Sequence, residues 1–258
     1  MTWILLRGLT REARHWATFP AGLERALPGE RVVAVDLPGA GVLHRERSPA
    51  DIEGFVDACR REAARLEAQP PFAFVALSLG AMVAVAWAHR YPDEVRRCVL
   101  LNTSLRPFAP FYRRLRPTRY ATVLRAMFAS GTRAREDLVL KMTSGRASAR
   151  AGVIDLWSDI ARERPVTRAN ALRQLWAAAC YRAPASPPRC NVLLLASRAD
   201  RLVDVRCSRA IARAWQVPLV EHPWAGHDLA LDDPQWVVEQ VRAWAGSPAP
   251  PPDALCPQ

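Results

Sequence analysis

Residues 72–90 read FAFVALSLGAMVAVAWAHR, and this stretch decides the fold. Residues 72–77 are an apolar run typical of a buried strand, and residues 79–90 continue as a helix that is apolar nearly all round. Ser78 stands at the turn between them. Ala76 and Gly80, two positions to either side, are small enough for a sharp turn to close and present the hydroxyl. We predict that Ser78 is a nucleophile; the alternative is that it only begins a buried helix.

Further apolar runs on both sides of this segment alternate with helical stretches. The predicted strands are residues 3–7, 31–37, 72–77, 98–101, 191–196 and 218–221. Strands that alternate with helices indicate an α/β fold with a mainly parallel central sheet and helices on both faces. In such sheets the reactive groups gather beyond the carboxyl ends of the strands.

Helix-start signals divide the helical stretches. The first stretch is broken at Pro20. Ser48 is predicted to be the N-cap of the helix before the nucleophile strand, with Pro49 as the first helical residue and Asp51 completing a capping box. The last helix is predicted over residues 233–244.

The alternation lapses over residues 105–188, an arginine-rich stretch with amphipathic fragments that ends in a run of prolines. We interpret it as a helical insertion. The α/β core is therefore predicted to comprise residues 1–104 and 189–246. Residues 247–258 are proline-rich and are predicted to form a disordered, dispensable tail.

Two further reactive side chains follow predicted strands. His227 lies in the loop after the last strand, where a neutral imidazole could take the proton of a serine and return it to the leaving group. Asp200 follows the strand over residues 191–196 and would orient that imidazole. Asp204 is its rival, although Asp204 better suits a helix cap. Considered alone, His227 could also be a surface-loop histidine.

The order of these residues strengthens the prediction. Nucleophile, acid and base occur as Ser78, Asp200 and His227, which is one of the known chain orders of serine triads. The backbone N–H groups of Leu79 and Leu9 are predicted to form the oxyanion hole. The other histidines lie in predicted helices, in a polar turn or too early in their loop; they are His15, His44, His89 and His222.

Composition argues against several other chemistries. The six cysteines form no C-x-x-C pair, and no histidine lies at zinc-finger spacing from them, so we expect reduced thiols, no metal and no cofactor. The turn at Ser78 divides the longest apolar run into pieces shorter than the roughly 20 residues of a membrane-spanning helix. The residues after Met1 resemble no secretion signal, which predicts a cytoplasmic protein.

The net charge of +11 comes almost entirely from arginine. Between residues 105 and 150 eleven cations stand against two acids, Glu136 and Asp137, so +9 of the net charge lies in this stretch. Such a surface could attract an anionic partner. The alternative is a solvated face whose aliphatic arginine stems cover apolar surface. No aromatic stacking pattern accompanies the charge, so nucleic-acid binding is not expected.

Taken together, these motifs resemble those of the α/β-hydrolase superfamily. The segments that resemble its first-strand, glycine-turn, elbow, post-elbow, acid and histidine motifs are residues 7–9, 36–41, 76–80, 91–95, 200–203 and 226–228. The resemblance implies that residues 105–188 form a cap over the active site. A serine nucleophile is unlike haloalkane dehalogenases and epoxide hydrolases, whose nucleophile is an aspartate.

Two positions depart from the family pattern, and the second, the missing serine after Gly41, is minor. Arg7 stands where the family has a histidine that shapes the oxyanion loop. We interpret Arg7 as a structural residue, with contact to an anionic substrate as the alternative.

The leading functional hypothesis is hydrolysis of a small-molecule carboxylic ester through an acyl-enzyme. An alternative keeps the triad but acts on an ester or thioester carried by acyl carrier protein or coenzyme A, which docks on the basic cap. The overall layout is similar to that of pimeloyl-carrier-protein methyl esterases. Further alternatives are a non-catalytic ligand-binding protein on the same fold, and a lyase or acyltransferase that uses the same triad.

Overall fold

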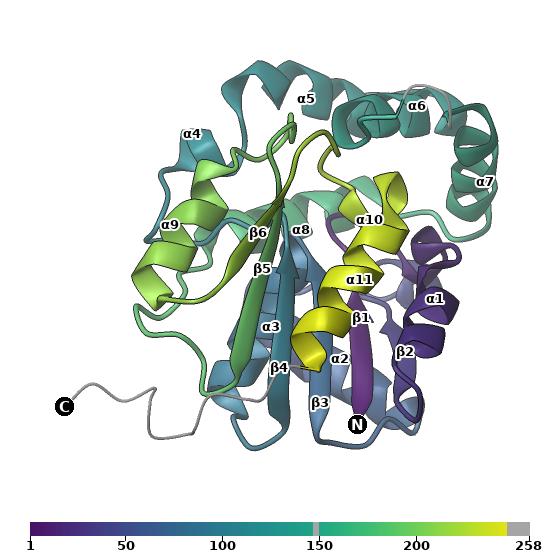
Figure 1. Cartoon of the computed structure of the whole chain (residues 1–258). Helices are drawn as coiled ribbons and strands as arrows, with labels where there is room; N and C mark the ends of the chain where they lie inside the picture. The colour runs from purple at the N-terminus through teal and green to yellow at the C-terminus, as the bar shows by residue number, and fades with distance from the viewer. Residues whose placement is uncertain (147–149, 247–258) are drawn as a thin grey trace.

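A six-stranded parallel sheet forms the centre of the computed structural model, which describes residues 1–146 and 150–246. The strands lie in the order β2-β1-β3-β4-β5-β6 (Figure 1). Their bounds are β1 (Thr2–Leu6), β2 (Arg31–Val35), β3 (Phe72–Leu77), β4 (Val95–Leu101), β5 (Asn191–Ser197) and β6 (Leu219–His222). Each predicted strand is present with small shifts at its ends, and the predicted α/β fold is confirmed.

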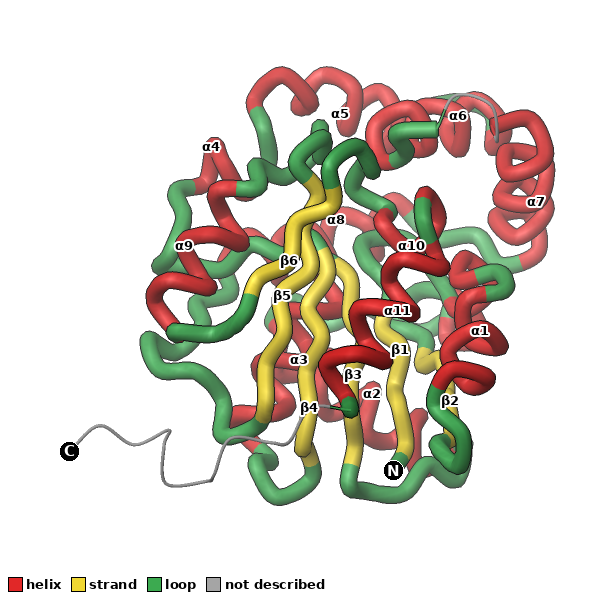
Figure 2. The backbone as a smooth tube through the Cα atoms, viewed as in Figure 1, coloured by secondary structure: helices red, strands yellow, loops and turns green. Residues whose placement is uncertain are grey.

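Helices cover both faces of this sheet (Figures 1 and 2). One face packs against α2 (Ile52–Arg65), α3 (Leu79–Arg90) and α9 (Arg206–Trp215). The other face packs against α1 (Phe19–Ala26) and α11 (Pro234–Ala245). The short helix α10 (Leu229–Asp232), which directly precedes α11 in the chain, packs on the same face. Two separate apolar clusters, one on each side of the sheet, form the core.

β3 and α3 occupy the middle of the fold, as their composition predicts. Every residue of β3 is buried, because the strand lies between β1 and β4 and carries helices on both faces. α3 is buried along its length from Leu79 to Ala88, and its polar residues stand only at its end. The C-terminus of β3 and the N-terminus of α3 therefore meet at Ser78, in the centre of the sheet edge.

Two helix starts differ from the prediction. The N-cap of α2 is Asp51, whose carboxylate accepts a hydrogen bond from the Gly54 N–H at 2.7 Å. Ser48 is not the cap: its hydroxyl donates to the Pro38 carbonyl at 2.7 Å, and its N–H donates to Asn170. These long-range bonds outweigh the local capping pattern. Pro20 lies in the first turn of α1, where proline is tolerated, so the helix begins there.

The segment between β4 and β5, here called the insert (residues 105–188), is helical in its described part. It contains α4 (Phe111–Arg114), α5 (Tyr120–Phe128), α6 (Thr132–Thr143), α7 (Arg150–Glu163) and α8 (Arg168–Cys180). Figure 1 shows α5 and α6 beyond the carboxyl ends of the strands. The predicted tail, residues 247–258, lies outside the described residues.

The described cysteines form no disulfide. Cys59, Cys98, Cys190 and Cys207 are buried and free, whereas Cys180 is free and exposed at the end of α8. Within residues 1–146 and 150–246, no helix has the length and apolar character that crossing a membrane requires.

Candidate active site

Ser78 stands in a strained turn at the end of β3. Its backbone angles, φ 55° and ψ −111°, are unfavourable for a residue with a side chain, so the surrounding structure must hold it there. The Ser78 N–H donates to the Leu101 carbonyl of β4 at 3.0 Å. Gly80 lets the turn close, because a Cβ at this position would lie 2.5 Å from the Leu6 carbonyl oxygen. The backbone is that expected for a nucleophile elbow.

Asp200 and His227 form a buried pair at the same edge of the sheet. The Nδ1 atom of His227 lies 2.7 Å from Oδ2 of Asp200. The other carboxylate oxygen of Asp200 accepts the N–H groups of Leu202 at 2.7 Å and Val203 at 3.0 Å. The carboxylate is thus held on both sides and fixes the ring of His227.

The surroundings of His227 raise the pKa of its imidazole. Burial alone would lower the pKa of the imidazole, but the charge of Asp200 and its hydrogen bond more than offset this effect. Asp228 adds a smaller raising effect and Arg7 a lowering one, and the net result is a pKa above the ordinary 6.5. A site with this balance stabilises the imidazolium that forms when His227 accepts a proton.

The rival acid, Asp204, has a different role. Its carboxylate accepts hydrogen bonds from the backbone and side chain of Arg206 at the start of α9. The bond from the Arg206 side chain is the main reason that its pKa falls to about 2. Asp204 therefore holds the first residue of α9, although the N-cap itself is Val205, and the structure brings Asp200 to His227 in its place.

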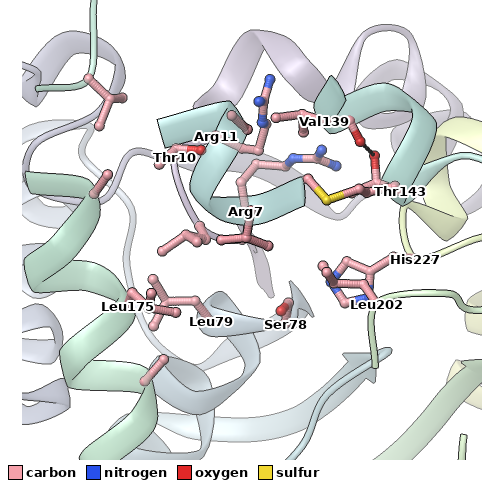
Figure 3. A pocket seen from close by; sticks show the side chains of 18 of the residues that line it. Arg7, Thr10, Arg11, Ser78, Leu79, Val139, Thr143, Leu175, Leu202 and His227 are labelled. Carbon is pink, nitrogen blue, oxygen red and sulfur yellow. Dashed lines mark hydrogen bonds between the residues drawn. The ribbon is translucent and has the colours of Figure 1, made fainter. Parts of the chain in front are cut away.

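Ser78 and His227 line one cavity of about 460 Å³ between the sheet edge and the insert. Figure 3 shows both side chains directed into it. No hydrogen bond joins them among the described residues, and catalytic contacts of this kind often tighten only when substrate binds. Most of the lining is apolar, with side chains such as Leu79, Met127 and Leu175.

The loop after β1 also lines the cavity. Gly8 lies directly against Ser78, since a Cβ on Gly8 would lie 3.4 Å from the Ser78 Cβ. The Thr10 N–H donates to the Gln174 side chain of α8 at 2.9 Å, which fixes the loop. Leu9 and Leu79 both line the cavity, and Leu79 is the first residue of α3, where N–H groups have no partner within the helix.

Arg7 forms a buried ion pair beside the site. Its guanidinium donates to both carboxylate oxygens of Asp228, at 3.0 and 2.5 Å, and lies 4.8 Å from the ring centre of Trp16. Both charged residues are only 2% exposed. The pair links the loop after β1 to the residue that follows His227, which supports the structural interpretation of Arg7.

Asp232 connects the histidine loop to the insert. Its carboxylate, 1% exposed, accepts the Gly226 N–H at 2.6 Å, the Gly145 N–H at 2.7 Å and the Ser144 hydroxyl at 2.6 Å. The Asp228 N–H also donates to the Thr143 carbonyl at 2.8 Å. Asp228 is thus bonded directly to the last residue of α6, and Gly226 is linked through Asp232 to the two residues that follow α6.

Sequence reasoning missed these supporting residues. Gln174 and Asp232 belong to no motif, and Asp228, although it lies in the histidine motif, was given no role; all three act through contacts with segments distant in the sequence. His15 also lines the cavity, although its position in a short helix suggested no such place. Burial, and then the charge of Arg11, hold the pKa of His15 well below its usual value.

The described residues offer no obvious metal site. Across positions 1–146 and 150–246, no three His, Cys, Asp or Glu side chains gather in a way that could hold an ion. His222, one of the histidines set aside from the sequence, bonds instead to Asp233 at 3.2 Å.

Residues 3–240 match the model of the alpha/beta hydrolase family. The chain belongs to this family. Family membership supports a hydrolase, and it agrees with the parallel sheet and the serine turn described above. No curated protein sequence is significantly similar to this hydrolase.

Solved structures with the same fold include several hydrolases at low sequence identity. A hydrolase from Pseudomonas aeruginosa PA01 is 19% identical, with a TM-score of 0.75 over 95% of this chain and 90% of that chain. A thermophilic esterase from Thermogutta terrifontis is 20% identical, with a TM-score of 0.69 over 95% and 89%. The 2-hydroxy-6-oxo-6-phenylhexa-2,4-dienoate hydrolase from Rhodococcus sp. strain RHA1 is 18% identical, with a TM-score of 0.73 over 95% and 89%. At these identities the likeness extends to the fold alone.

Proposed function

We propose that the protein hydrolyses a carboxylic ester through an acyl-enzyme, with Ser78 as nucleophile, His227 as base and Asp200 as the acid that orients the base. The observation that carries this proposal is the buried His227–Asp200 pair, 2.7 Å apart, whose histidine lines the same largely apolar cavity as Ser78, a serine in a strained strand-to-helix turn. An apolar cavity with a few convergent polar groups suits an organic ester.

The mechanism follows from the hydrogen bonds. With Nδ1–H of His227 donated to Asp200, Nε2 is left to accept the Ser78 proton as the hydroxyl oxygen attacks the ester carbonyl. The N–H groups of Leu79 and Leu9 would hold the oxyanion, and losing one such donor typically costs about 2.7–4 kcal/mol in the transition state. The alkoxide leaves with the proton from His227, and a water molecule that His227 deprotonates releases the acid.

The proposed cap is the insert, residues 105–188. Its helices α5, α6, α7 and α8 contribute much of the cavity lining, so the insert would set which esters fit. The shape of this lining, together with core residues such as Leu79 and Met82, would determine which ester fits.

The direct test is hydrolysis of p-nitrophenyl esters from acetate to laurate by the wild type and by Ser78→Ala. We expect wild-type turnover with an optimum chain length, and loss of at least about 10³-fold in Ser78→Ala. Full activity in the mutant would disprove the assignment of Ser78. Wild-type protein that is inert on every ester would favour a non-catalytic binding protein or a carrier-bound substrate.

The carrier-linked alternative stays a prediction, because no contact in the described residues favours a carrier over a small ester. Its signature is salt dependence. Hydrolysis of an ester or thioester on acyl carrier protein should fall steeply with ionic strength, whereas hydrolysis of p-nitrophenyl butyrate should not. Equal insensitivity of both reactions to salt would exclude electrostatic docking.

A further inference from the structure

Three helices of the insert expose large apolar side chains. The side chains, 48% to 72% exposed, are Phe111 and Tyr112 of α4, Leu124 and Phe128 of α5, and Leu172 and Trp176 of α8. We call this set the α4–α5–α8 face. Scattered exposed apolar residues are ordinary on protein surfaces, but a joined group of this size marks a contact surface.

The members of this face are joined by spacing and by contacts. The two residues on α5 are four positions apart, as are the two on α8, so each pair lies on one side of its helix. The Arg168 guanidinium of α8 lies 5.4 Å from the ring centre of Phe128 on α5. Arg114 of α4 donates to the carbonyls of Ala178 and Ala179 at the end of α8. The three helices therefore present one continuous surface.

The α4–α5–α8 face is positively charged without compensation. Residues 105–135 and 164–199 contain no aspartate or glutamate. Two exposed arginines lie on the helices of this face, Arg125 of α5 and Arg168 of α8, and two more, Arg106 and Arg182, lie in the segments before α4 and after α8. No acidic partner is found for these four among the described residues. The cations of α6 and α7 differ, because Arg133, Lys141 and Arg162 each pair with an aspartate of the insert. The α4–α5–α8 face therefore combines unpaired positive charge with large exposed apolar side chains, whereas α6 and α7 pair several of their cations within the insert.

The same helices line the cavity with their inner sides. Tyr120, Val123 and Met127 of α5 and Leu175 of α8 contribute to it. Phe111 is 72% exposed and also lines the cavity, so the cavity reaches the surface beside the α4–α5–α8 face. A molecule bound on this face would lie next to the opening of the cavity that contains Ser78.

We propose that the α4–α5–α8 face binds the surface of a membrane that contains anionic phospholipids. Aromatic and leucine side chains can enter the boundary between headgroups and acyl chains, while arginines contact the phosphates. An acidic protein would satisfy the arginines but would leave six large apolar side chains against a polar surface. A lipid surface accommodates both features, because it offers negative charge and an apolar layer at adjacent depths.

This binding concerns the outer surface and is independent of ester hydrolysis. In the bound state the cavity opening would face the lipid, which would let lipophilic esters enter without crossing water.

Sedimentation with vesicles tests this proposal on the full-length protein. The vesicles are phosphatidylcholine alone or phosphatidylcholine mixed with phosphatidylglycerol. We expect binding to the mixed vesicles to be at least about tenfold stronger than to the neutral ones, and to weaken in about 0.5 M NaCl. Arg125→Glu and the double variant Phe128→Ser/Trp176→Ser should each weaken binding about tenfold or more.

The controls change matched residues elsewhere on the surface. Arg61→Glu on α2 and Leu156→Ser on α7 alter an exposed arginine and an exposed leucine outside the α4–α5–α8 face, and both should bind as the wild type does. Ser78→Ala should also bind normally, so failure of the hydrolytic proposal would be visible separately. None of the altered residues other than Ser78 lines the cavity. Hydrolysis of p-nitrophenyl butyrate should therefore stay unchanged in every surface variant, and only Ser78→Ala should lose it.

Three outcomes would overturn the proposal. The first is wild-type protein that sediments with neither kind of vesicle. The second is equal binding by the wild type and the variants Arg125→Glu and Phe128→Ser/Trp176→Ser. The third is absence of vesicle binding together with binding of acyl carrier protein that Arg125→Glu abolishes, because this result would assign the face to an acidic protein.

Discussion

His227 has its pKa raised by Asp200, and this single contact predicts the pH dependence of the reaction. The base must be neutral to accept the Ser78 proton, so kcat/KM should rise with pH as His227 loses its proton. Since the pKa lies above the ordinary 6.5, the midpoint of this rise should also lie above 6.5. Asp200→Asn should lower the midpoint and reduce kcat about 10⁴-fold, because the ring loses both its charge partner and its orientation.

The matched control for Asp200 is Asp204, four residues on. Asp204→Asn should keep the wild-type pH profile, because Asp204 contacts Arg206 and the start of α9 and makes no contact with His227. A pH profile that shifts in Asp204→Asn but not in Asp200→Asn would reverse the assignment of the acid. The readout is the initial rate on p-nitrophenyl butyrate across pH.

Arg7 and Asp228 form a buried ion pair that we expect to stabilise the fold. Replacing one member leaves an uncompensated buried charge, so Arg7→Leu should lower the free energy of unfolding by about 3–5 kcal/mol. Arg65→Leu is the control: its side chain is 61% exposed while bonded to Glu62, and its loss should cost under about 1 kcal/mol. Urea unfolding measures both. A loss below about 1 kcal/mol in Arg7→Leu would contradict the structural role.

At the scale of elements, the end of α6 and the histidine loop behave as one unit. Gly226 has no room for a side chain, because a Cβ there would lie 2.5 Å from the Thr143 carbonyl oxygen. Asp232 closes the unit through its bonds to Gly226 and to residues 144 and 145. A shift of α6 would therefore move the backbone on either side of His227, and the insert would influence the base as well as the cavity.

This coupling predicts a kinetic effect for Asp232→Ala. Displacing His227 by about 1 Å costs on the order of 10²-fold in rate, so kcat should fall 10- to 100-fold, with little change in KM. Asp233→Ala is the neighbouring control. Asp233 caps α11 by accepting the Trp236 N–H, and its loss should cost about 1 kcal/mol of stability with kcat retained. Equal kcat values in the two variants would contradict a positioning role for Asp232.

Elements with strong local patterns could be predicted from the sequence. β3 and α3 have the predicted bounds. Both segments are almost entirely apolar, so they are stable only when buried in the core. Ser48 shows where local reasoning fails. A hydrogen bond with Asn170, 122 residues away, holds Ser48 outside the helix that its capping pattern predicts. Helix starts are sensitive to such contacts, because a cap is worth only about 1 kcal/mol.

Some residues of the candidate site could likewise be predicted from the sequence, and others could not. Ser78, Asp200 and His227 could be proposed because each follows a strand, and parallel strands end at one edge of the sheet. Gln174, Asp228 and Asp232 could not, because each acts through a hydrogen bond between segments that only the folded chain brings together. The sequence shows Arg7 as a departure from the family pattern, but it does not predict that Arg7 pairs with Asp228.

At the scale of the whole molecule, the cavity between sheet and insert sets the size of the substrate. Leu175→Trp on α8 fills part of its lining, so hydrolysis of long-chain p-nitrophenyl esters should fall about tenfold or more, while the acetate should react normally. Leu172→Trp, on the exposed side of the same helix, should leave the chain-length profile unchanged. A profile that shifts only in Leu172→Trp would place the acyl chain outside this cavity.

The charge distribution also belongs to this scale. The sequence predicts a basic surface across residues 105–150, and the fold divides it. α6 and α7 neutralise several of their cations internally, whereas α4 and α5 join α8 in a face without acids. The pairing could not be predicted from the sequence, because Arg133 and Asp155, for example, meet only when α6 packs on α7.

The measurement that tests the central claim most directly is covalent labelling with a p-nitrophenyl alkylphosphonate, followed by intact-mass and peptide mass spectrometry. The phosphorus is attacked by an activated serine, p-nitrophenolate leaves, and a stable phosphonate ester remains on the nucleophile. We predict one adduct per chain, located on Ser78, with labelling lost in Ser78→Ala and strongly slowed in His227→Ala. An adduct on another residue, or equal labelling of Ser78→Ala, would contradict Ser78 as the activated nucleophile.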